Sequence, residues 1–239
     1  MIDAVIFDVD GTLVDSVNLH AKACQVAFEK FEKEVSFEAI RRQIGKGSDQ
    51  LLPVFFSADE LRRFGNELDE FRGELFRAEY LPRVKPFAKV RDLFQRLRHD
   101  GRKIALASSA KEEELNDYKK LAEIEDLIEV ETSSADVERS KPHPDVFAVA
   151  RQKLGPIDAD KIVVVGDTPH DAEAAAHAHM PIIGLLSGGW TERRLRDAGC
   201  IEVYSHPADL LAHYDQSALS LSIEDSPEKR IQAPRSFAL

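Results

Sequence analysis

Cysteine is scarce in this sequence. The 239 residues contain two, Cys24 and Cys200, which lie far apart and show no CxxC spacing. A disulfide framework or a cysteine-ligated metal site is therefore not expected. We predict that both residues are ordinary buried thiols.

Long apolar runs are missing as well. No apolar stretch approaches the ~20 residues that a membrane-spanning helix requires. The chain begins directly on a short apolar segment, with no basic stretch, signal-like apolar region or cleavage site before it. These features predict a cytoplasmic protein in a reducing compartment, with no membrane partner.

Positive charge is in deficit, with 32 Lys and Arg against 43 Asp and Glu and a net charge of −11. Nucleic acid and anionic membranes are therefore poor general partners, although a local basic site can still bind a small anion. The hydrophobic content of 43% suffices for a sizeable core. The length suits one core domain that carries an insertion, and a monomer is the default expectation.

The apolar pattern between residues 15 and 84 is helical throughout, and nothing there resembles a strand. Pro82 and Pro86 end the last helix of this stretch and mark a linker. Helices are expected at 16–33, 37–44, 51–55 and 59–80.

Elsewhere, short apolar runs alternate with helical patterns. This alternation predicts the α/β class, with a Rossmann-like parallel sheet and helices on both of its faces. Strands are expected at 4–7, 103–107, 127–130, 161–165, 181–186 and 201–204, and helices at 87–99, 111–121, 144–154, 171–178, 191–198 and 207–214.

These patterns divide the chain into three parts. Residues 1–14 and 85–214 are expected to form the α/β core, and residues 15–84 an inserted α-helical domain. Residues 215–239 are rich in Ser and charge and contain Pro227 and Pro234. They form a C-terminal tail that is either mobile or packs late onto the core.

Polar side chains follow several of the expected strands, and ligands bind beyond the carboxyl ends of strands in such sheets. Asp8 at the end of a buried strand needs a metal, a cation or dense hydrogen bonding, because an uncompensated charge there is costly. The Asp-Val-Asp-Gly segment taken alone is also compatible with a simple turn. The strand-end residues expected to converge are Asp8, Asp10, Thr12, Ser108, Ser109, Lys141, Asp167 and Asp171.

Four segments resemble, in order and spacing, the motifs of the haloacid dehalogenase-like superfamily. They are Asp-Val-Asp-Gly-Thr-Leu-Val-Asp-Ser from Asp8, Ala-Leu-Ala-Ser-Ser ending at Ser109, Ser-Lys-Pro-His-Pro-Asp-Val-Phe from Ser140, and Val-Gly-Asp-Thr-Pro-His-Asp ending at Asp171. The helical insertion is similar to the cap of the group that contains phosphoglycolate phosphatase and β-phosphoglucomutase. The resemblance covers residues 1–215.

A hard oxygen cluster suits Mg²⁺ at this edge of the sheet. Its expected ligands are Asp8, Asp10 through its backbone carbonyl, and Asp167. The resemblance implies that Asp8 is the nucleophile, which forms an aspartyl-phosphate, and that Asp10 protonates the leaving oxygen and later activates water.

The remaining residues have supporting roles in this scheme. Lys141 would offset the charge of Asp8 and of the phosphoryl group. Thr12, Ser108 and Ser109 would donate hydrogen bonds to the phosphoryl oxygens. Asp171 would support the metal shell or Lys141, or cap the helix that follows it.

In the cap, a loop with Lys46 and Ser48 could reach the substrate on closure or simply connect two helices. His20, early in the first helix of the insertion, could likewise contact the substrate or have only a structural role. Arg41, Arg42 and the charged run at 112–114 are interpreted as solvated charge.

The resulting hypothesis is a Mg²⁺-dependent phosphatase that acts on a small phosphorylated metabolite. A phosphomutase of the β-phosphoglucomutase type is the nearest alternative. Dehalogenase activity is disfavoured because Asp10 is present, and phosphonate cleavage needs a cap lysine that Lys46 alone does not establish. From another class, a non-catalytic protein that binds phosphometabolites remains an alternative.

Overall fold

The computed structural model describes residues 2–220. The strands are β1 (Ala4–Phe7), β2 (Lys103–Ala107), β3 (Val130–Thr132), β4 (Ile162–Gly166), β5 (Ile182–Leu185) and β6 (Glu202–Tyr204). The α-helices are α1 (Val17–Lys30), α2 (Phe37–Arg41), α3 (Ser48–Leu51), α4 (Ala58–Leu75), α5 (Val90–His99), α6 (Glu112–Leu121), α7 (Asp145–Leu154), α8 (Pro169–His177), α9 (Glu192–Asp197) and α10 (Pro207–Ala212).

Short helical turns complete the secondary structure. A π-helical turn at Phe76–Tyr80 continues α4. Turns of 3-10 helix lie at Leu52–Val54, Leu81–Arg83, Glu125–Leu127, Ser134–Asp136, Ala159–Lys161, Leu186–Gly188 and Tyr214–Gln216. No helix within residues 2–220 combines the length and the apolar character that a membrane span requires.

The sheet has six strands in the order β3-β2-β1-β4-β5-β6, and all neighbours are parallel. β1 is central, with Phe7 opposite Leu106 of β2 and Val165 of β4. Parallel strands end at the same edge, so the residues that follow β1, β2 and β4 share that edge.

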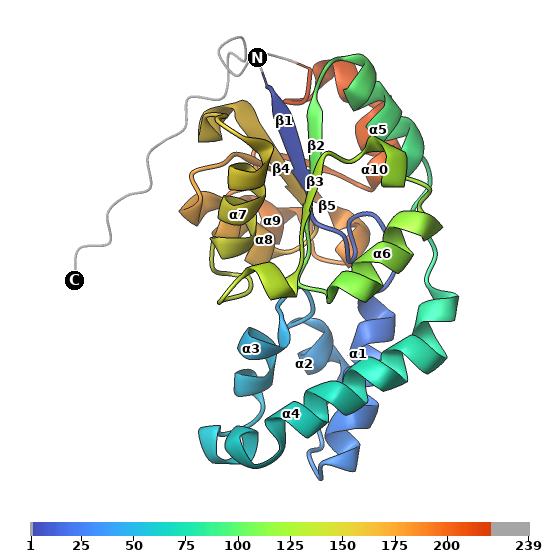
Figure 1. Ribbon diagram of the computed structural model, residues 1–239, viewed down its shortest axis with the longest axis vertical. Helices are drawn as coiled ribbons and strands as arrows, with labels where there is room; N and C mark the ends of the chain where they lie inside the picture. The colour runs from blue at the N-terminus through green and yellow to red at the C-terminus, as the bar shows by residue number, and fades with distance from the viewer. Residues whose placement is uncertain (1, 221–239) are drawn as a thin grey trace, which may run out of the picture.

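Helices cover both faces of the sheet, and the predicted α/β fold is confirmed (Figure 1). On one face, Phe7 packs in an apolar cluster with residues of α5, α6 and α10. On the other face, Ile6 packs with residues of α7, α8 and α9. Alternate residues of β1 thus point to opposite layers, and the strand is apolar throughout because both of its faces are buried.

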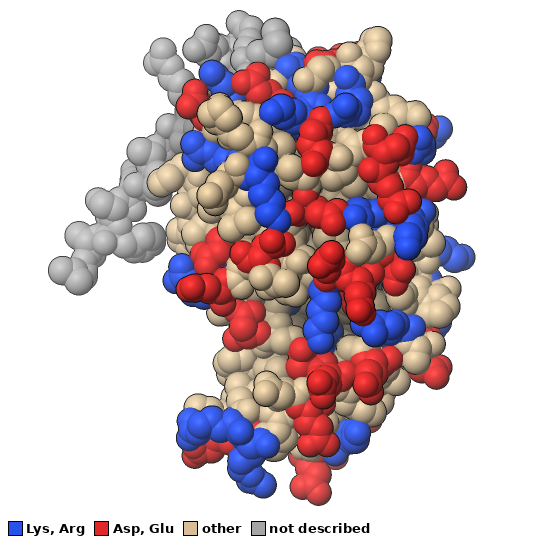
Figure 2. All heavy atoms as spheres, viewed as in Figure 1, with Lys and Arg blue, Asp and Glu red and all other residues tan. Residues whose placement is uncertain are grey.

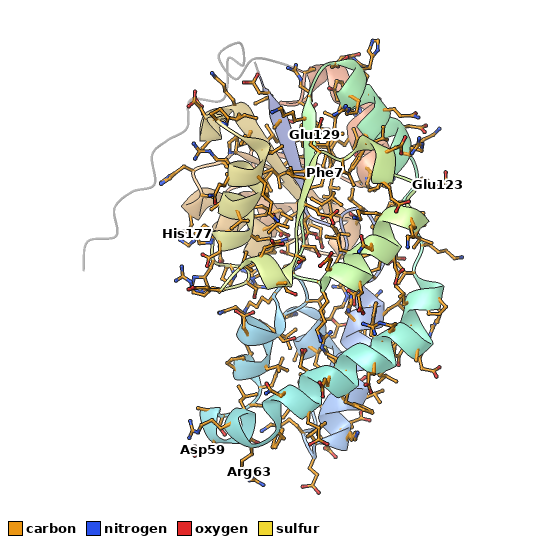
Figure 3. All side chains as sticks on the ribbon, viewed as in Figure 1. Phe7, Asp59, Arg63, Glu123, Glu129 and His177 are labelled. Carbon is orange, nitrogen blue, oxygen red and sulfur yellow. The ribbon has the colours of Figure 1, made fainter. Side chains whose placement is uncertain are left out.

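Helices α1 to α4 form a separate layer at the carboxyl edge of the sheet, with no strand between residues 15 and 84 (Figure 1). This insertion has its own apolar cluster, in which Phe28 of α1 packs with Leu68 of α4. Ser57 and Glu60 form a capping box that begins α4, near the tip marked by Asp59 and Arg63 in Figure 3.

The chain enters and leaves the insertion through two backbone segments that lie side by side. Val14 forms an antiparallel bridge with Pro86. Asp15 N donates to Lys85 O at 2.8 Å, and Phe87 N donates to Leu13 O at 2.9 Å. The insertion therefore starts and ends at one point of the core.

The bounds of several predicted elements differ from the structure, and two of these shifts have a clear physical cause. The strand expected at 127–130 is displaced to Val130–Thr132. Leu127 and Ile128 pack against the core cluster from a turn, and the polar residues that follow complete a short edge strand, which pairs on one side only. The helix expected at 171–178 begins at Pro169, because Thr168 is its N-cap and a proline suits the first helical position.

The start of the expected C-terminal tail packs onto the core. Ala218 and Leu219 belong to the apolar cluster on the α5 and α10 face, and the Ser217 hydroxyl donates to Tyr214 O at 2.7 Å. Residues 221–239, with Pro227 and Pro234, lie outside the described part of the chain.

Candidate active site

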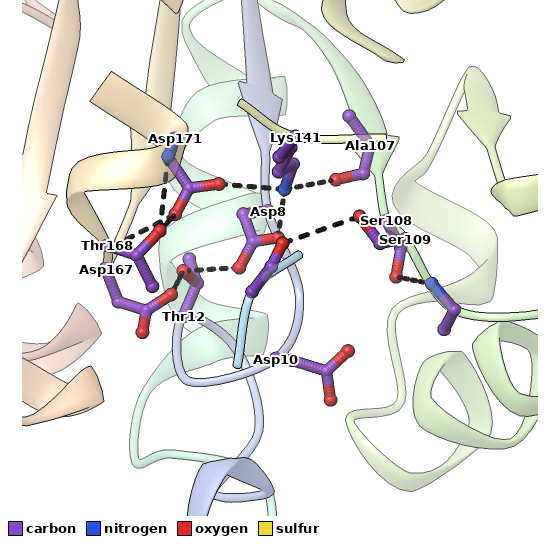
Figure 4. Close-up of polar contacts among 12 residues, drawn as sticks. Asp8, Asp10, Thr12, Ala107, Ser108, Ser109, Lys141, Asp167, Thr168 and Asp171 are labelled. Carbon is purple, nitrogen blue, oxygen red and sulfur yellow. Dashed lines mark hydrogen bonds and ion pairs between the residues drawn. The ribbon is translucent and has the colours of Figure 1, made fainter. Parts of the chain in front are cut away.

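Asp8 and Lys141 form a buried ion pair at the carboxyl end of β1 (Figure 4). The Lys141 ammonium has no exposed surface. It also lies 2.8 Å from Asp171 Oδ1 and donates to Ala107 O at 3.1 Å. Lys141 thus joins the ends of β1 and β2 to helix α8.

Burial controls the ionisation of these groups. It raises the pKa of Asp8 to about 7, although the positive charge of Lys141 opposes the shift. Burial and the negative charges of Asp8 and Asp171 raise the pKa of Asp167 well above its ordinary value. Burial alone would lower the pKa of Lys141, but the carboxylates of Asp171 and Asp8 outweigh it and raise that pKa.

Asp171 performs two of its expected tasks at once. Its Oδ2 accepts hydrogen bonds from Thr168 N at 3.0 Å and from the Thr168 hydroxyl at 2.6 Å, which closes the capping box of α8. Its Oδ1 faces Lys141. Both oxygens therefore have partners within the protein.

The carboxylates of Asp8, Asp167 and Asp171 place oxygen atoms within 4.8 Å of one another. Within residues 2–220, Asp167 Oδ2 is buried with no hydrogen-bond partner. An unpaired carboxylate oxygen beside Asp8 fits a hard divalent cation such as Mg²⁺. All donor atoms of this cluster are carboxylate oxygens.

The Asp10 side chain extends away from this cluster (Figure 4). The Ser16 hydroxyl donates to Asp10 Oδ1 at 2.5 Å, and His20 Nε2 lies 3.0 Å from the same oxygen. Burial alone would raise the pKa of Asp10. The charge and hydrogen bond of His20 and the hydroxyl of Ser16 outweigh this effect, so the pKa is lowered. The Asp10 side chain is thus paired outside this cluster, and the role of its carbonyl as a metal ligand stays a prediction.

His20 lies beside Asp10, on the first turn of α1. Its Nε2 is 3.0 Å from the Tyr118 hydroxyl and 3.5 Å from Glu114 Oε1, and its ring stacks on Phe76 at 3.8 Å. His20, which the sequence suggested as a possible substrate contact, therefore lies against Asp10, the proposed acid and base. The expectation that the run at 112–114 is solvated is wrong for Glu114, whose side chain is 17% exposed.

The three predicted hydroxyls differ in their surroundings. The Thr12 hydroxyl lies 2.9 Å from Asp8 Oδ2 and 3.0 Å from Asp167 Oδ1. Ser108 is fully buried, and its Oγ accepts from Ala110 N at 3.0 Å. Of these three, Ser109 lines the cavity.

A cavity of about 290 Å³ lies between the core and the insertion. Figure 2 shows acidic and basic side chains together along the junction of these two parts. Asp8 and Asp10 line the core side of the cavity, and Lys46 and Ser48 line its insertion side. The other charged residues that line it are Asp49, Asp69, Arg72, Arg77, Lys111, Glu114 and Glu138.

Sequence reasoning missed the polar group around Arg72 on α4. The Arg72 guanidinium donates to Asp69 Oδ1 at 2.9 Å and to the Ser48 hydroxyl at 3.3 Å. Lys111 Nζ lies 3.6 Å from Asp69 Oδ2. Asp69 and Arg72 stand on a helix rich in charge, and the apolar spacing of that helix gave no sign of which polar residues face the core.

The sheet is parallel, carries buried carboxylates and a lysine at its carboxyl edge, and is covered at that edge by the helical insertion. These features are those of an enzyme with Rossmann-like architecture. The particular family follows from comparison with known proteins. The chain belongs to the haloacid dehalogenase-like hydrolases, whose family model matches residues 5–185. The resemblance predicted from the four motifs is confirmed.

Curated relatives span nearly the whole chain. A phosphorylated carbohydrates phosphatase from Thermotoga maritima is 27% identical over 214 residues, which cover 87% of this chain and 96% of the relative. A phosphoglycolate phosphatase from Yersinia pestis is 30% identical over 218 residues, which cover 89% and 90%. The crystal structure of a hydrolase from Pseudomonas syringae superposes with a TM-score of 0.79 at 27% identity, covering 90% of this chain and 98% of that one.

Proposed function

We propose that this protein is a Mg²⁺-dependent phosphatase that hydrolyses a small phosphomonoester through an aspartyl-phosphate on Asp8. The observation that carries the proposal is the placement of Asp8 and Asp10 on one cavity wall, with Lys141 on Asp8. Asp8 is paired with the Lys141 ammonium. Asp10 instead contacts the Ser16 hydroxyl and the His20 imidazole.

Asp8 has to be ionised to attack phosphorus. The Lys141 ammonium favours the ionised form against the effect of burial. One Asp8 oxygen forms the new bond to phosphorus while the bond to the leaving oxygen breaks. Asp10 donates a proton to that oxygen from its protonated form, which its lowered pKa makes the minor form in the free protein. In the second step Asp10 takes a proton from water, which attacks the phosphoryl group and releases Asp8.

Asp8, Asp167 and the Asp10 carbonyl would hold Mg²⁺. When bound, the ion supplies positive charge to the carboxylates and to a phosphoryl oxygen. Thr12 holds the carboxylates of Asp8 and Asp167 in a shared orientation, and Asp171 holds Lys141. The unpaired Asp167 oxygen supports this assignment.

The insertion at 15–84 acts in this proposal as a cap on a core formed by residues 1–14 and 85–214. Both acidic and basic groups line the cavity, which suits a leaving group with hydroxyl or carboxylate substituents. Relatives named as phosphatases of phosphorylated carbohydrates and of phosphoglycolate support this substrate class.

The test is phosphate release from an aryl phosphate and from a panel of sugar phosphates and phosphoglycolate. We expect turnover that chelation abolishes and Mg²⁺ restores, and that Asp8→Asn and Asp10→Asn each reduce by at least about 1000-fold. Asp92→Asn, in an exposed ion pair with Lys89, is the matched control. Activity that survives chelation or Asp8→Asn would refute the proposal.

The same assays separate the alternatives. A phosphomutase would convert β-glucose 1-phosphate in a coupled assay with a bisphosphate activator, because a sugar hydroxyl rather than water accepts the phosphoryl group. A non-catalytic binding protein would bind one phosphometabolite tightly and turn over none of the panel.

A further inference from the structure

A loop of the insertion is hydrogen-bonded to the residue that precedes Lys141. Ser140 N donates to Asp49 Oδ2 at 3.0 Å, and the Ser140 hydroxyl donates to Asp49 Oδ1 at 2.5 Å. Gly47 N donates to Ser140 Oγ at 2.9 Å. Each polar group of Ser140 that faces the insertion thus has a partner there.

The approach of the two loops is unusually close. A Cβ atom at Gly47 would lie 2.7 Å from both Cβ and Oγ of Ser140 and 2.8 Å from Asp49 Oδ1. Only glycine allows this contact without movement. Ser140 is 4% exposed, so Asp49 satisfies donors that water does not reach well.

The Lys141 ammonium has three partners on three elements, Asp8 after β1, Ala107 on β2 and Asp171 on α8. Its backbone, in contrast, belongs to the loop between β3 and α7. The side chain reaches all three partners from its present backbone position, and Asp49 accepts a hydrogen bond from the N–H of the preceding residue, Ser140. A displacement of Ser140 is therefore transmitted to Lys141.

We propose that Asp49 is a positioning residue for Lys141. Through Ser140 it fixes the lysine against Asp8, and it does so from the insertion, so that the ion pair reaches its working geometry when the insertion lies against the core. This inference rests on the proposed role of Asp8 as nucleophile. In this arrangement the position of the Lys141 loop depends on the contact between the insertion and the core, which also encloses the substrate.

Asp49 also lines the cavity, so direct contact with the substrate is the competing role. The two roles have different kinetic signatures. Loss of a substrate contact raises KM, whereas loss of lysine alignment lowers kcat and leaves KM nearly unchanged.

The kinetic test compares Asp49→Ala, Asp49→Asn and Ser140→Ala with the wild type. We expect Asp49→Ala to lower kcat about 10- to 100-fold, as small displacements of catalytic groups do, with KM within about threefold. Asp49→Asn retains an oxygen acceptor for Ser140 N and should recover most of kcat. The double variant Asp49→Ala/Ser140→Ala should lose no more than Asp49→Ala alone.

Asp59→Asn is the matched control, since Asp59 stands at the far tip of the insertion (Figure 3) and is 80% exposed. We expect its kcat and KM to equal those of the wild type. A kcat for Asp49→Ala within twofold of the control, or a loss carried by KM alone, would overturn the inference.

Hydrogen exchange at the Ser140 amide, measured by NMR, tests the contact without reference to activity. We expect exchange to be about tenfold faster or more in Asp49→Ala and unchanged in Asp59→Asn, because a hydrogen bond to a charged acceptor is lost. Unchanged exchange in Asp49→Ala would overturn the inference. An inactive wild type would refute the phosphatase proposal, and the exchange comparison would still decide the role of the Asp49 contact.

Discussion

Gly188 offers a direct test of the oxygen cluster, because its α-carbon lies against Asp167. A Cβ atom at this position would stand 1.7 Å from Asp167 Oδ2 and 2.6 Å from its Cγ. Asp167 Oδ2 is the buried oxygen that we assign to Mg²⁺. The substitution Gly188→Ala therefore displaces one proposed metal ligand without removing any polar group.

The magnitude follows from the overlap. The new contact falls about 1.7 Å short of the 3.4 Å at which ordinary van der Waals contact begins. The carboxylate or the loop at Leu186–Gly188 has to move by more than an ångström, and Gly188 O, which accepts from Arg41 at 2.9 Å, limits the loop. We expect about 1–3 kcal/mol of destabilisation and about a 100-fold loss of kcat.

The assay measures kcat during a Mg²⁺ titration and the free energy of unfolding from a urea transition. Gly65→Ala in α4 is the control, because its Cβ would lie 3.5 Å from the nearest side-chain atom of Leu61. It should stabilise the protein by up to about 1 kcal/mol with unchanged kcat. If Gly188→Ala keeps the wild-type kcat and Mg²⁺ dependence, the assignment of Asp167 to the metal is wrong.

Three further predictions follow from buried groups and helix ends. Lys141→Met should abolish activity and destabilise the protein by about 3–5 kcal/mol at pH 8, and urea transitions should show a smaller deficit at pH 5. Burial raises the pKa of Asp8 to about 7 even though Lys141 opposes the shift, and without Lys141 that pKa rises further. At pH 5 Asp8 is therefore neutral in both proteins, whereas at pH 8 only the wild type pairs an ionised Asp8 with a cation; an equal deficit at both pH values would contradict this reasoning. Burial raises the pKa of Cys24 to about 11 and of Cys200 to about 12. A thiol reagent at pH 8 should label neither until the chain unfolds, and stability should decline as the pH rises above 9, where only unfolded thiols ionise; rapid labelling in native buffer would disprove it. Ser57→Ala removes the capping box of α4 and should cost about 1 kcal/mol in thermal or urea unfolding with kcat unchanged, and a drop in kcat would show that the tip of the insertion reaches the site.

The carboxyl edge of the sheet, with the candidate site, was the most predictable part of the molecule. Asp8 and Asp167 each follow an apolar run that is buried on both faces, so the strand and the polar residue after it are both visible in the sequence. The edge strand was less visible, because Leu127 and Ile128 are apolar without belonging to it and Glu131 belongs to it without being apolar.

Contacts between the insertion and the core could not be predicted in the same way. Arg72 and Glu114 lie on helices from different parts of the chain, and only the relative placement of those helices brings them to one cavity. Asp49 is hydrogen-bonded to a residue 91 positions away. Periodicity describes which face of a helix is apolar, but it does not describe what a polar face meets.

The paired backbone crossings at Val14–Pro86 have a consequence for how such proteins diversify. Because the insertion leaves and rejoins the core at adjacent residues and has an apolar cluster of its own, we expect that it can be exchanged as a unit. A chimaera that joins residues 1–14 and 85–220 of this chain to the helical segment of a relative requires only two splice points. In such an exchange the sheet and its carboxylates stay in the chain, but Asp49 leaves with the insertion. The incoming segment therefore has to supply its own partner for Ser140 if Lys141 is to keep its position.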